Sequence, residues 1–292
     1  MDDLKITLIQ ADLHWENKEK NFDTFSNKIK AISESTDLIV LPEMFSTGFS
    51  MDSKKLAETM NGDTVSWMRT MAVKKNCAIT GSFICEEDGN YFNRLVWMNP
   101  GGTCTHYNKR HLFRMGNEHS HYSPGENKII VDLKGWKICP LICYDLRFPV
   151  WSRNQRTANS EQLIEKRGKL YSDENTHPQS NFHNPQYQYD VLIYVANWPE
   201  KRAHPWKTLL LARAIENQCY VVGLNRVGND GNNFSHSGDS AIINAKGEII
   251  SNINPFEESV KTITICFDEL ESFRKSFPAI LDADNFNVIY SD

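Results

Sequence analysis

Apolar and polar residues alternate along the chain in blocks that predict strands and helices in turn. Apolar runs at 6–10 and 38–41 predict two strands, and the spacing of apolar positions over 18–31 predicts a helix between them. The run at 38–41 is apolar at every position, which is typical of a strand that a layered α/β fold buries on both faces. Further helices are predicted at 63–75, 146–153, 206–217 and 268–275, and further strands at 77–84, 93–98, 129–132, 137–143, 190–196, 220–225, 240–243, 248–251 and 261–267.

The segment 154–187 breaks this alternation, because Asn, Gln, Ser, His and charged residues dominate it. Such a composition does not bury a core, so we expect an exposed excursion. Strand signals resume at Asp190 and leave the α/β alternation intact on both sides. We therefore expect one domain over 1–292 with a polar surface insertion at about 154–187. The tail at 285–290 has strand character and is a candidate for packing on a partner subunit.

The composition favours a cytoplasmic protein with one large core. Of the 292 residues 40% are hydrophobic, and the net charge of −5 comes with scattered lysines and arginines that offer no basic face to a nucleic acid. The first ten residues carry acids instead of a basic segment, and their apolar run is too short for a signal sequence or a membrane span. The seven cysteines lack CxxC or Cys/His finger spacing, so we expect reduced thiols.

Three charged or nucleophilic side chains lie where a predicted strand gives way to a loop. They are Glu43 in LIVLPEMF, Lys109 in HYNKRHLF and Cys143 in CPLICYDLRFP. Loops at strand ends are where a rigid scaffold presents catalytic groups. Taken singly, each residue has an ordinary explanation: a glutamate that caps a turn, a solvated lysine and a buried core thiol. The combination of all three is more specific than any one of them.

These three segments resemble the signature of the nitrilase superfamily of carbon-nitrogen hydrolases, and the resemblance spans nearly the whole chain. It implies that Glu43 is a general base, that Lys109 stabilises the transition state and that Cys143 is the nucleophile. It also implies a four-layer α/β/β/α sandwich, a homodimer or higher homo-oligomer, and no cofactor. Glu118 matches a position where the superfamily often carries a further active-site carboxylate that orients the lysine or the substrate. An ordinary loop glutamate is the alternative for Glu118.

Elementary chemistry supports these roles. A cysteine attacks as thiolate, and we expect the start of a helix and the Lys109 ammonium to lower the pKa of Cys143. The tetrahedral intermediate of an amide carries an oxyanion, for which Lys109 and the backbone N–H of Tyr144 are the candidate donors. Ammonia must leave protonated and water must then open a thioester. One carboxylate, that of Glu43, would accept and return protons in both steps.

Candidate substrate-binding residues follow the strand predicted after the polar insertion. Asn197 and Trp198 in YVANWP, and Trp206 in HPW, resemble the pocket segment of amidase members of the superfamily. Packing at a helix start explains Trp206 equally well. Arg147 is a candidate to bind a substrate carboxylate bidentately, although an internal salt bridge to Asp145 or to a nearby acid is the favoured alternative.

Within the superfamily, NKRHLF, ICYDLRFP and YVANWP look most like segments of omega-amidases. That resemblance implies a small-molecule amide as substrate, namely a 2-oxo acid with a terminal amide such as 2-oxoglutaramate. The products would be the dicarboxylate and ammonia. Nitrilases, carbamoylases and acyl transferases share the triad, so the reaction subtype rests on resemblance alone.

Two other classes of function stay open. A metal-dependent amidohydrolase would use the loop cluster of His111, Glu118, His119 and His121 to hold zinc, but the chain lacks the HExxH helix and the paired histidine spacing of such enzymes. A non-catalytic scaffold would keep the fold without the chemistry. The complete Glu-Lys-Cys set argues against that scaffold.

Overall fold

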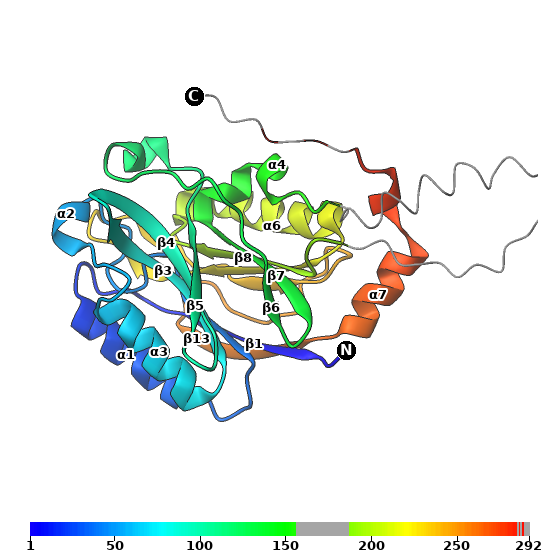
Figure 1. The fold of residues 1–292 in the computed structure, drawn as a ribbon, viewed down its shortest axis with the longest axis horizontal. Coiled ribbons are helices and arrows are strands. Elements are labelled where there is room, and N and C mark those ends of the chain that lie inside the picture. The colour runs from blue at the N-terminus through cyan, green and yellow to red at the C-terminus, as the bar shows by residue number, and fades with distance from the viewer. Residues whose placement is uncertain (156–186, 285, 287, 289–292) are drawn as a thin grey trace, which may run out of the picture.

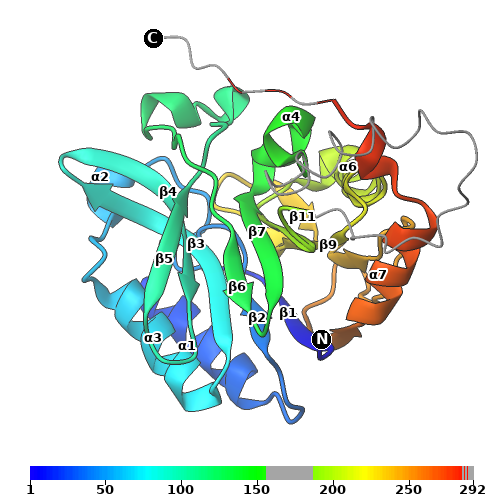
Figure 2. The same ribbon diagram turned by 45° about the vertical axis from the view of Figure 1, so that its right-hand side comes forward.

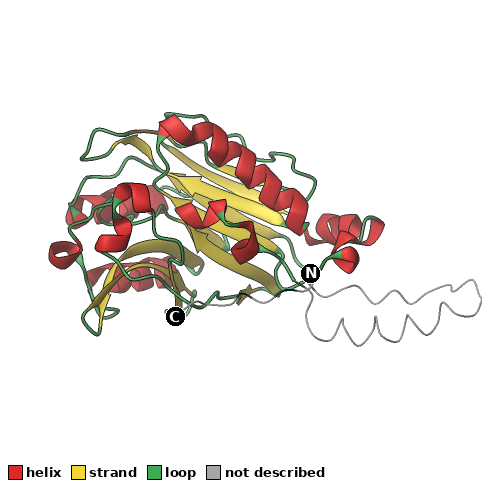
Figure 3. Ribbon diagram, turned by 90° about the horizontal axis from the view of Figure 1, so that it is seen from above, coloured by secondary structure: helices red, strands yellow, loops and turns green. Residues whose placement is uncertain are grey.

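Two β-sheets face each other, and helices cover their outer faces, in the computed structural model, which describes residues 1–155, 187–284, 286 and 288 (Figure 1). Seen from above, the helices lie outside the sheets (Figure 3). The α/β sandwich that the sequence predicts is therefore confirmed. Within these residues, every helix is too short or too polar to span a bilayer.

The first sheet combines parallel and antiparallel strands. In order across the sheet they are β13 (Ser259–Ile265), β1 (Leu4–Gln10), β2 (Leu38–Val40), β3 (Ala78–Glu87), β4 (Asn90–Met98) and β5 (Cys104–Asn108). β2 is parallel to both of its neighbours, and the other pairs are antiparallel. Helices α1 (Lys18–Lys30) and α3 (Asp63–Lys75) cover the outer face (Figure 2), where the sequence predicts helices.

The second sheet has a parallel centre. Its strands, in order, are β12 (Ala241–Ile243), β9 (Tyr220–Asn225), β8 (Val191–Ala196), β7 (Trp136–Ile142) and β6 (Val131–Leu133). β7, β8 and β9 run parallel, and helices α6 (Ala203–Asn217) and α7 (Phe267–Ser276) lie on the outer side (Figure 2). α6 approaches β9 so closely that a Cβ at Gly223 would come within 2.5 Å of Leu210. A larger residue at 223 would therefore require Leu210 to move.

Strand β2 shows how the apolar pattern determines the layers. Leu38 and Val40 belong to the buried cluster that joins the two sheets, and Ile39 belongs to the cluster beneath α1 and α3. All three side chains are fully buried. The prediction of a strand buried on both faces is confirmed, because successive side chains of a strand point to opposite sides.

The segment after β7 differs from the single helix predicted at 146–153. It forms a 3₁₀ turn, Cys143–Arg147, followed by the short helix α4 (Pro149–Ser152). Proline has no backbone N–H, so Pro149 cannot extend a helix from the preceding turn. The strand predicted at 248–251 was also wrong, since it is reduced to one bridge between Ile249 and Ile243.

Several elements are too short to carry a detectable period, and the sequence did not predict them. They are α2 (Ser53–Leu56), β10 (Val227–Asn229), β11 (Ser235–Ser237) and the 3₁₀ turns Arg114–Gly116, Glu118–Ser120, Glu200–Arg202 and Ala279–Asp282. β10 and β11 pair as a separate antiparallel hairpin.

Most of the predicted insertion, 156–186, and most of the tail at 285–290 lie outside the described residues. The residues at its two ends, Asn154 and Tyr187, are buried. Asn154 donates from Nδ2 to the Tyr189 carbonyl at 2.8 Å, and its backbone N–H donates to Asn217 Oδ1 at 2.8 Å. The Tyr187 hydroxyl donates to Gln218 at 2.9 Å. These hydrogen bonds tie both ends to the fold, because buried polar groups require partners.

Candidate active site

Four charged or nucleophilic side chains from distant parts of the sequence meet in one buried site. Glu43 follows β2, Lys109 directly follows β5 and Cys143 directly follows β7. Glu118 opens a 3₁₀ turn in the loop after Lys109. All four are buried, and Cys143, at 8% exposure, is the most accessible of them. The structure thus brings together the four residues that the sequence singled out as catalytic candidates.

The Glu43 carboxylate is held by donors on both oxygens. Its Oε1 accepts from Lys109 Nζ at 2.8 Å and from Asn93 Nδ2 at 2.8 Å. Its Oε2 accepts from the Asn197 backbone N–H at 2.8 Å. These bonds fix the orientation of Glu43. Burial raises the pKa of the Cys143 thiol, and the negative charge of Glu43 lies close enough to that thiol to raise its pKa further.

Lys109 lies between two carboxylates. Its Nζ donates to both oxygens of Glu118 at 3.0 Å, in addition to Glu43. The backbone N–H of Phe113 holds Glu118 Oε2 at 2.5 Å. Burial alone would lower the pKa of Lys109, but the charges of Glu118 and Glu43 raise that pKa above its ordinary value. The lysine is a permanent cation in this site.

Cys143 occupies a strained position at the end of β7. Its φ of 41° lies in the left-handed region, which costs free energy in a residue with a side chain. The following 3₁₀ turn has only five residues. A turn this short has a much weaker dipole than the helix whose start we expected to lower the pKa of Cys143.

The pKa of Cys143 is raised, which corrects the prediction of a lowered pKa. Burial has the largest effect, the negative charge of Glu43 adds to it, and the Lys109 ammonium opposes it without prevailing. The resting residue is therefore a neutral thiol beside the Glu43 carboxylate. It needs that carboxylate as a base when it attacks.

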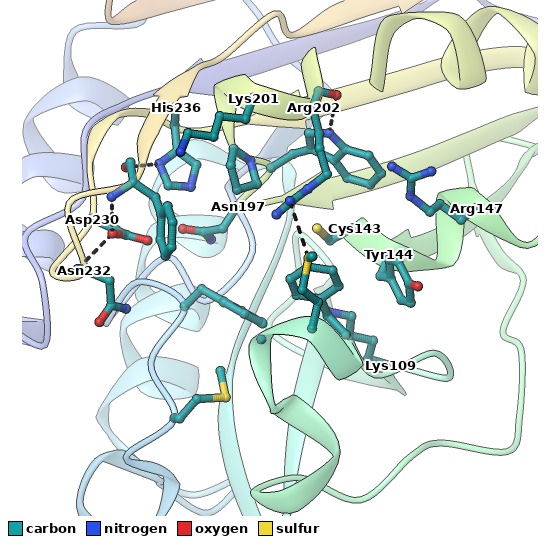
Figure 4. A pocket seen from close by; sticks show the side chains of 18 residues that line it. Lys109, Cys143, Tyr144, Arg147, Asn197, Lys201, Arg202, Asp230, Asn232 and His236 are labelled. Carbon is teal, nitrogen blue, oxygen red and sulfur yellow. Dashed lines mark hydrogen bonds between the residues drawn. The ribbon is translucent and has the colours of Figure 1, made fainter. Parts of the chain in front are cut away.

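A cavity of about 440 Å³ opens beside the thiol (Figure 4). Of the five residues predicted to bind substrate, Tyr144, Arg147, Asn197 and Trp198 line this cavity. The other lining residues are Phe49, Met51, Lys109, Phe113, Met115, Gly116, Cys143, Pro199, Lys201, Arg202, Asp230, Asn232, Phe234 and His236. The wall is largely apolar and aromatic, with a few polar groups, as is typical of small-molecule sites.

Trp206 does not line the cavity, so its predicted contact with substrate was wrong. It lies on α6, fully buried, and its Nε1 donates to the Asp239 carbonyl at 2.9 Å. Its ring packs against Trp198 with centroids 5.4 Å apart. Trp206 therefore supports the cavity wall from behind. This agrees with the other explanation given for Trp206, packing at the start of a helix.

Arg147 faces the cavity and not Asp145, contrary to the salt-bridge alternative. Its guanidinium lies 5.1 Å from the centroid of the Trp198 ring. Asp145 accepts instead from Tyr107, His111 and the Ile142 backbone. Arg147 is left with its charge directed to the cavity.

Several residues of the site were missed by sequence reasoning. Asn93, on β4, bridges the two carboxylates by donating to Glu43 at 2.8 Å and to Glu118 at 3.2 Å. A buried asparagine inside an apolar strand was the available signal. Lys201, Arg202 and the β10–β11 hairpin line the cavity without any periodic pattern that could reveal them.

The histidine cluster of the metal hypothesis is not assembled as a ligand set. His111 Nδ1 lies 2.8 Å from Asp145, and Glu118 is turned to Lys109. In the part of the chain that the structure describes, no group of three His, Cys, Asp or Glu side chains is placed to hold a metal ion. The geometry therefore gives that alternative no support.

Comparison with known proteins agrees with this geometry. The family model described as "Carbon-nitrogen hydrolase" matches residues 5–275. "Omega-amidase YafV" of Escherichia coli K12 is 41% identical over 99% of this chain and 100% of its own length. The "2-oxoglutaramate amidase" of Bacillus subtilis 168 is 29% identical over 95% of this chain and 96% of its own length.

A solved structure has the same fold over the full length. XC1258 from Xanthomonas campestris is described as a CN-hydrolase superfamily protein with an arsenic adduct in its active site. It is 42% identical, and it matches with a TM-score of 0.88 over 99% of this chain and 100% of its own.

Proposed function

Since the chain belongs to the carbon-nitrogen hydrolase family of the nitrilase superfamily, we propose that it hydrolyses the omega-amide of a small 2-oxo dicarboxylic acid such as 2-oxoglutaramate. The products are the dicarboxylate and ammonia. The observation that carries the proposal is the meeting of Glu43, Lys109 and Cys143 in one buried site, where Glu43 accepts from Lys109 Nζ at 2.8 Å and both Lys109 and Cys143 line one cavity. A homodimer and a cytoplasmic location are further proposals that rest on family resemblance.

The first half of the reaction transfers the acyl group to sulfur. Glu43 removes the thiol proton as Cys143 attacks the amide carbonyl carbon. Lys109 Nζ and the Tyr144 backbone N–H stabilise the oxyanion, and each such donor contributes roughly 3 kcal/mol. Glu43 then returns the proton to nitrogen, the carbon-nitrogen bond breaks, and ammonia leaves a thioester behind.

The second half uses water and the same carboxylate. Glu43 takes a proton from water, whose oxygen attacks the thioester carbonyl carbon. The oxyanion forms at the same position and is stabilised by the same donors. The carbon-sulfur bond breaks, the proton returns to the sulfur, and the carboxylic acid leaves. Glu118 keeps the Lys109 ammonium in place throughout, through the two contacts at 3.0 Å.

Asn197 supplies an acceptor for the substrate amide. Its backbone N–H and its Nδ2 both bind Glu43, the latter at the carbonyl oxygen. Its Oδ1 is buried and has no partner among the described residues, and the residue lines the cavity. A buried acceptor without a partner is costly. An N–H of the bound amide would satisfy it.

Three cations at the cavity support a substrate with an anionic far end. Arg147, Lys201 and Arg202 line it, and none of them forms an ion pair with a described carboxylate. The lining carboxylate, Asp230, already accepts the backbone N–H groups of Asn232 and Phe234 in its own turn. A substrate carboxylate would therefore meet unpaired positive charge in a partly apolar pocket.

The preference for an anionic amide is tested by Arg147→Met. We expect kcat/KM for 2-oxoglutaramate to fall about 10- to 100-fold, because a charged hydrogen bond contributes roughly 1.5–3 kcal/mol. Hydrolysis of butyramide, which lacks the carboxylate, should change by less than about 3-fold. Ammonia release from both amides, from glutamine and from a nitrile gives the comparison.

The matched control is Lys246→Met, which removes an exposed cation that does not line the cavity. It should leave both activities unchanged. Equal losses on 2-oxoglutaramate and butyramide in Arg147→Met would contradict carboxylate recognition by Arg147. A wild-type preference for the nitrile would favour the nitrilase alternative.

A further inference from the structure

Two segments that carry catalytic residues meet at one buried carboxylate that the proposed reaction does not use. Asp145 is fully buried. It lies two residues after Cys143, in the segment ICYDLRFP, and it contacts the segment NKRHLF that contains Lys109. No lysine or arginine pairs with it among the described residues, so hydrogen bonds must stabilise its charge.

The first oxygen of Asp145 holds the strand that leads to the nucleophile. Oδ2 accepts from the Ile142 backbone N–H at 3.1 Å and from the Tyr107 hydroxyl at 2.8 Å. Ile142 directly precedes Cys143, and Tyr107 lies on β5. The same hydroxyl accepts from the Arg110 backbone N–H at 3.1 Å. This side of the carboxylate therefore connects β7 with β5.

The second oxygen holds the residues just after Lys109. Oδ1 accepts from the His111 backbone N–H at 3.0 Å, and His111 Nδ1 lies 2.8 Å from it. The His111 ring is stacked on Phe148, with centroids 3.7 Å apart and planes 5° apart. The Asp145 carboxylate thus accepts hydrogen bonds from the residue before Cys143 and from a residue just after Lys109.

We propose that Asp145 is a positioning residue that sets the separation between the Cys143 sulfur and the Lys109 ammonium. The two groups must reach the same carbonyl group from different sheets, and a displacement of about 1 Å can lower a rate about 100-fold. Cys143 also has an unfavourable φ of 41°, and the bond from Ile142 to Asp145 spans that residue. The carboxylate acts through its hydrogen bonds to the backbone N–H groups of Ile142 and His111.

The carboxylate form is required because each of its oxygens accepts a backbone N–H group, which can only donate. The Tyr107 hydroxyl and the His111 imidazole nitrogen complete the surroundings of the two oxygens. An asparagine has the same shape but would place an NH₂ group against one of the two N–H groups. Asp145→Asn therefore breaks the connection on one side without changing the volume.

The test is Asp145→Asn, assayed by steady-state kinetics and by alkylation of Cys143 with iodoacetamide. This inference rests on the proposed function for its kinetic readout, whereas alkylation needs no amide substrate. We expect kcat to fall about 10- to 100-fold with KM within about 3-fold of wild type, and alkylation to slow in parallel. If the wild type hydrolysed no amide, slower alkylation would still support the positioning role.

Two further variants separate positioning from other roles. His111→Ala keeps the hydrogen bond from the backbone N–H of residue 111 to Asp145. It should therefore lower kcat less than Asp145→Asn does. Tyr107→Phe removes one donor and serves if Asp145→Asn does not fold; a lower kcat at constant KM supports the proposal. An equal loss of kcat in His111→Ala and Asp145→Asn would overturn the proposal and would favour a role for the imidazole. Faster alkylation in Asp145→Asn would also overturn it, because a merely loosened fold exposes the thiol.

Discussion

Replacing Cys143 by alanine is expected to lower ammonia release from the amide at least about 10⁴-fold, since loss of a covalent nucleophile removes the whole reaction path. Among the described residues that line the cavity, Cys143 is the single thiol, and no serine or threonine accompanies it. No second thiol and no serine or threonine hydroxyl among these lining residues is available to replace it. Ammonia release by the purified variant, with 2-oxoglutaramate at saturating concentration, is the measurement.

Cys139→Ala provides the matched control. Cys139 lies on the same strand β7, is fully buried, and has its pKa raised to about 12 by burial. We expect near wild-type kcat from this variant, with a loss of unfolding free energy of about 1 kcal/mol. If Cys143→Ala kept more than about 1% of wild-type activity, the assignment of the nucleophile would be wrong.

Glu43→Gln is expected to lower kcat about 10³-fold at neutral pH, within the range that general-base catalysis contributes. Burial has the largest effect on the pKa of Cys143 and raises it above its ordinary value. Burial persists in the variant, so little thiolate forms at neutral pH without a base. The residual rate of the variant should rise about tenfold per pH unit below the thiol pKa, because solvent must then remove the proton. The pH dependence of kcat measures this.

The control for Glu43→Gln is Glu248→Gln, which neutralises an exposed glutamate that does not line the cavity. It should retain the wild-type rate and pH profile. A Glu43→Gln enzyme that lost less than about 10-fold in kcat, or whose rate did not change with pH, would contradict the role of general base.

Much of the fold could be predicted from the sequence, because it depends on local periodicity. α3 occupies the predicted range 63–75, and the apolar run at 38–41 contains β2. The end of a strand is also visible in a sequence, so Glu43 and Cys143 could be expected near one another. These features need only the order of apolar and polar residues.

The site walls and the electrostatics could not be predicted, because they depend on which segments meet in space. No sequence pattern distinguishes the role of Trp198 from that of Trp206. Trp198 lines the cavity, whereas Trp206 packs against Trp198 from behind. The β10–β11 hairpin has three-residue strands and no detectable period. The sign of the pKa shift of Cys143 depends on burial and on the proximity of Glu43, which no local pattern records.

The central claim, that the sulfur of Cys143 carries the acyl group, is tested most directly by mass spectrometry. The enzyme is mixed with an activated ester that carries the acyl group of the proposed amide substrate, because such an ester acylates fast. The reaction is then quenched with acid. The account predicts that the acyl mass is found on the peptide that contains Cys143, as a thioester that hydroxylamine removes. An acyl group on any other peptide would contradict it.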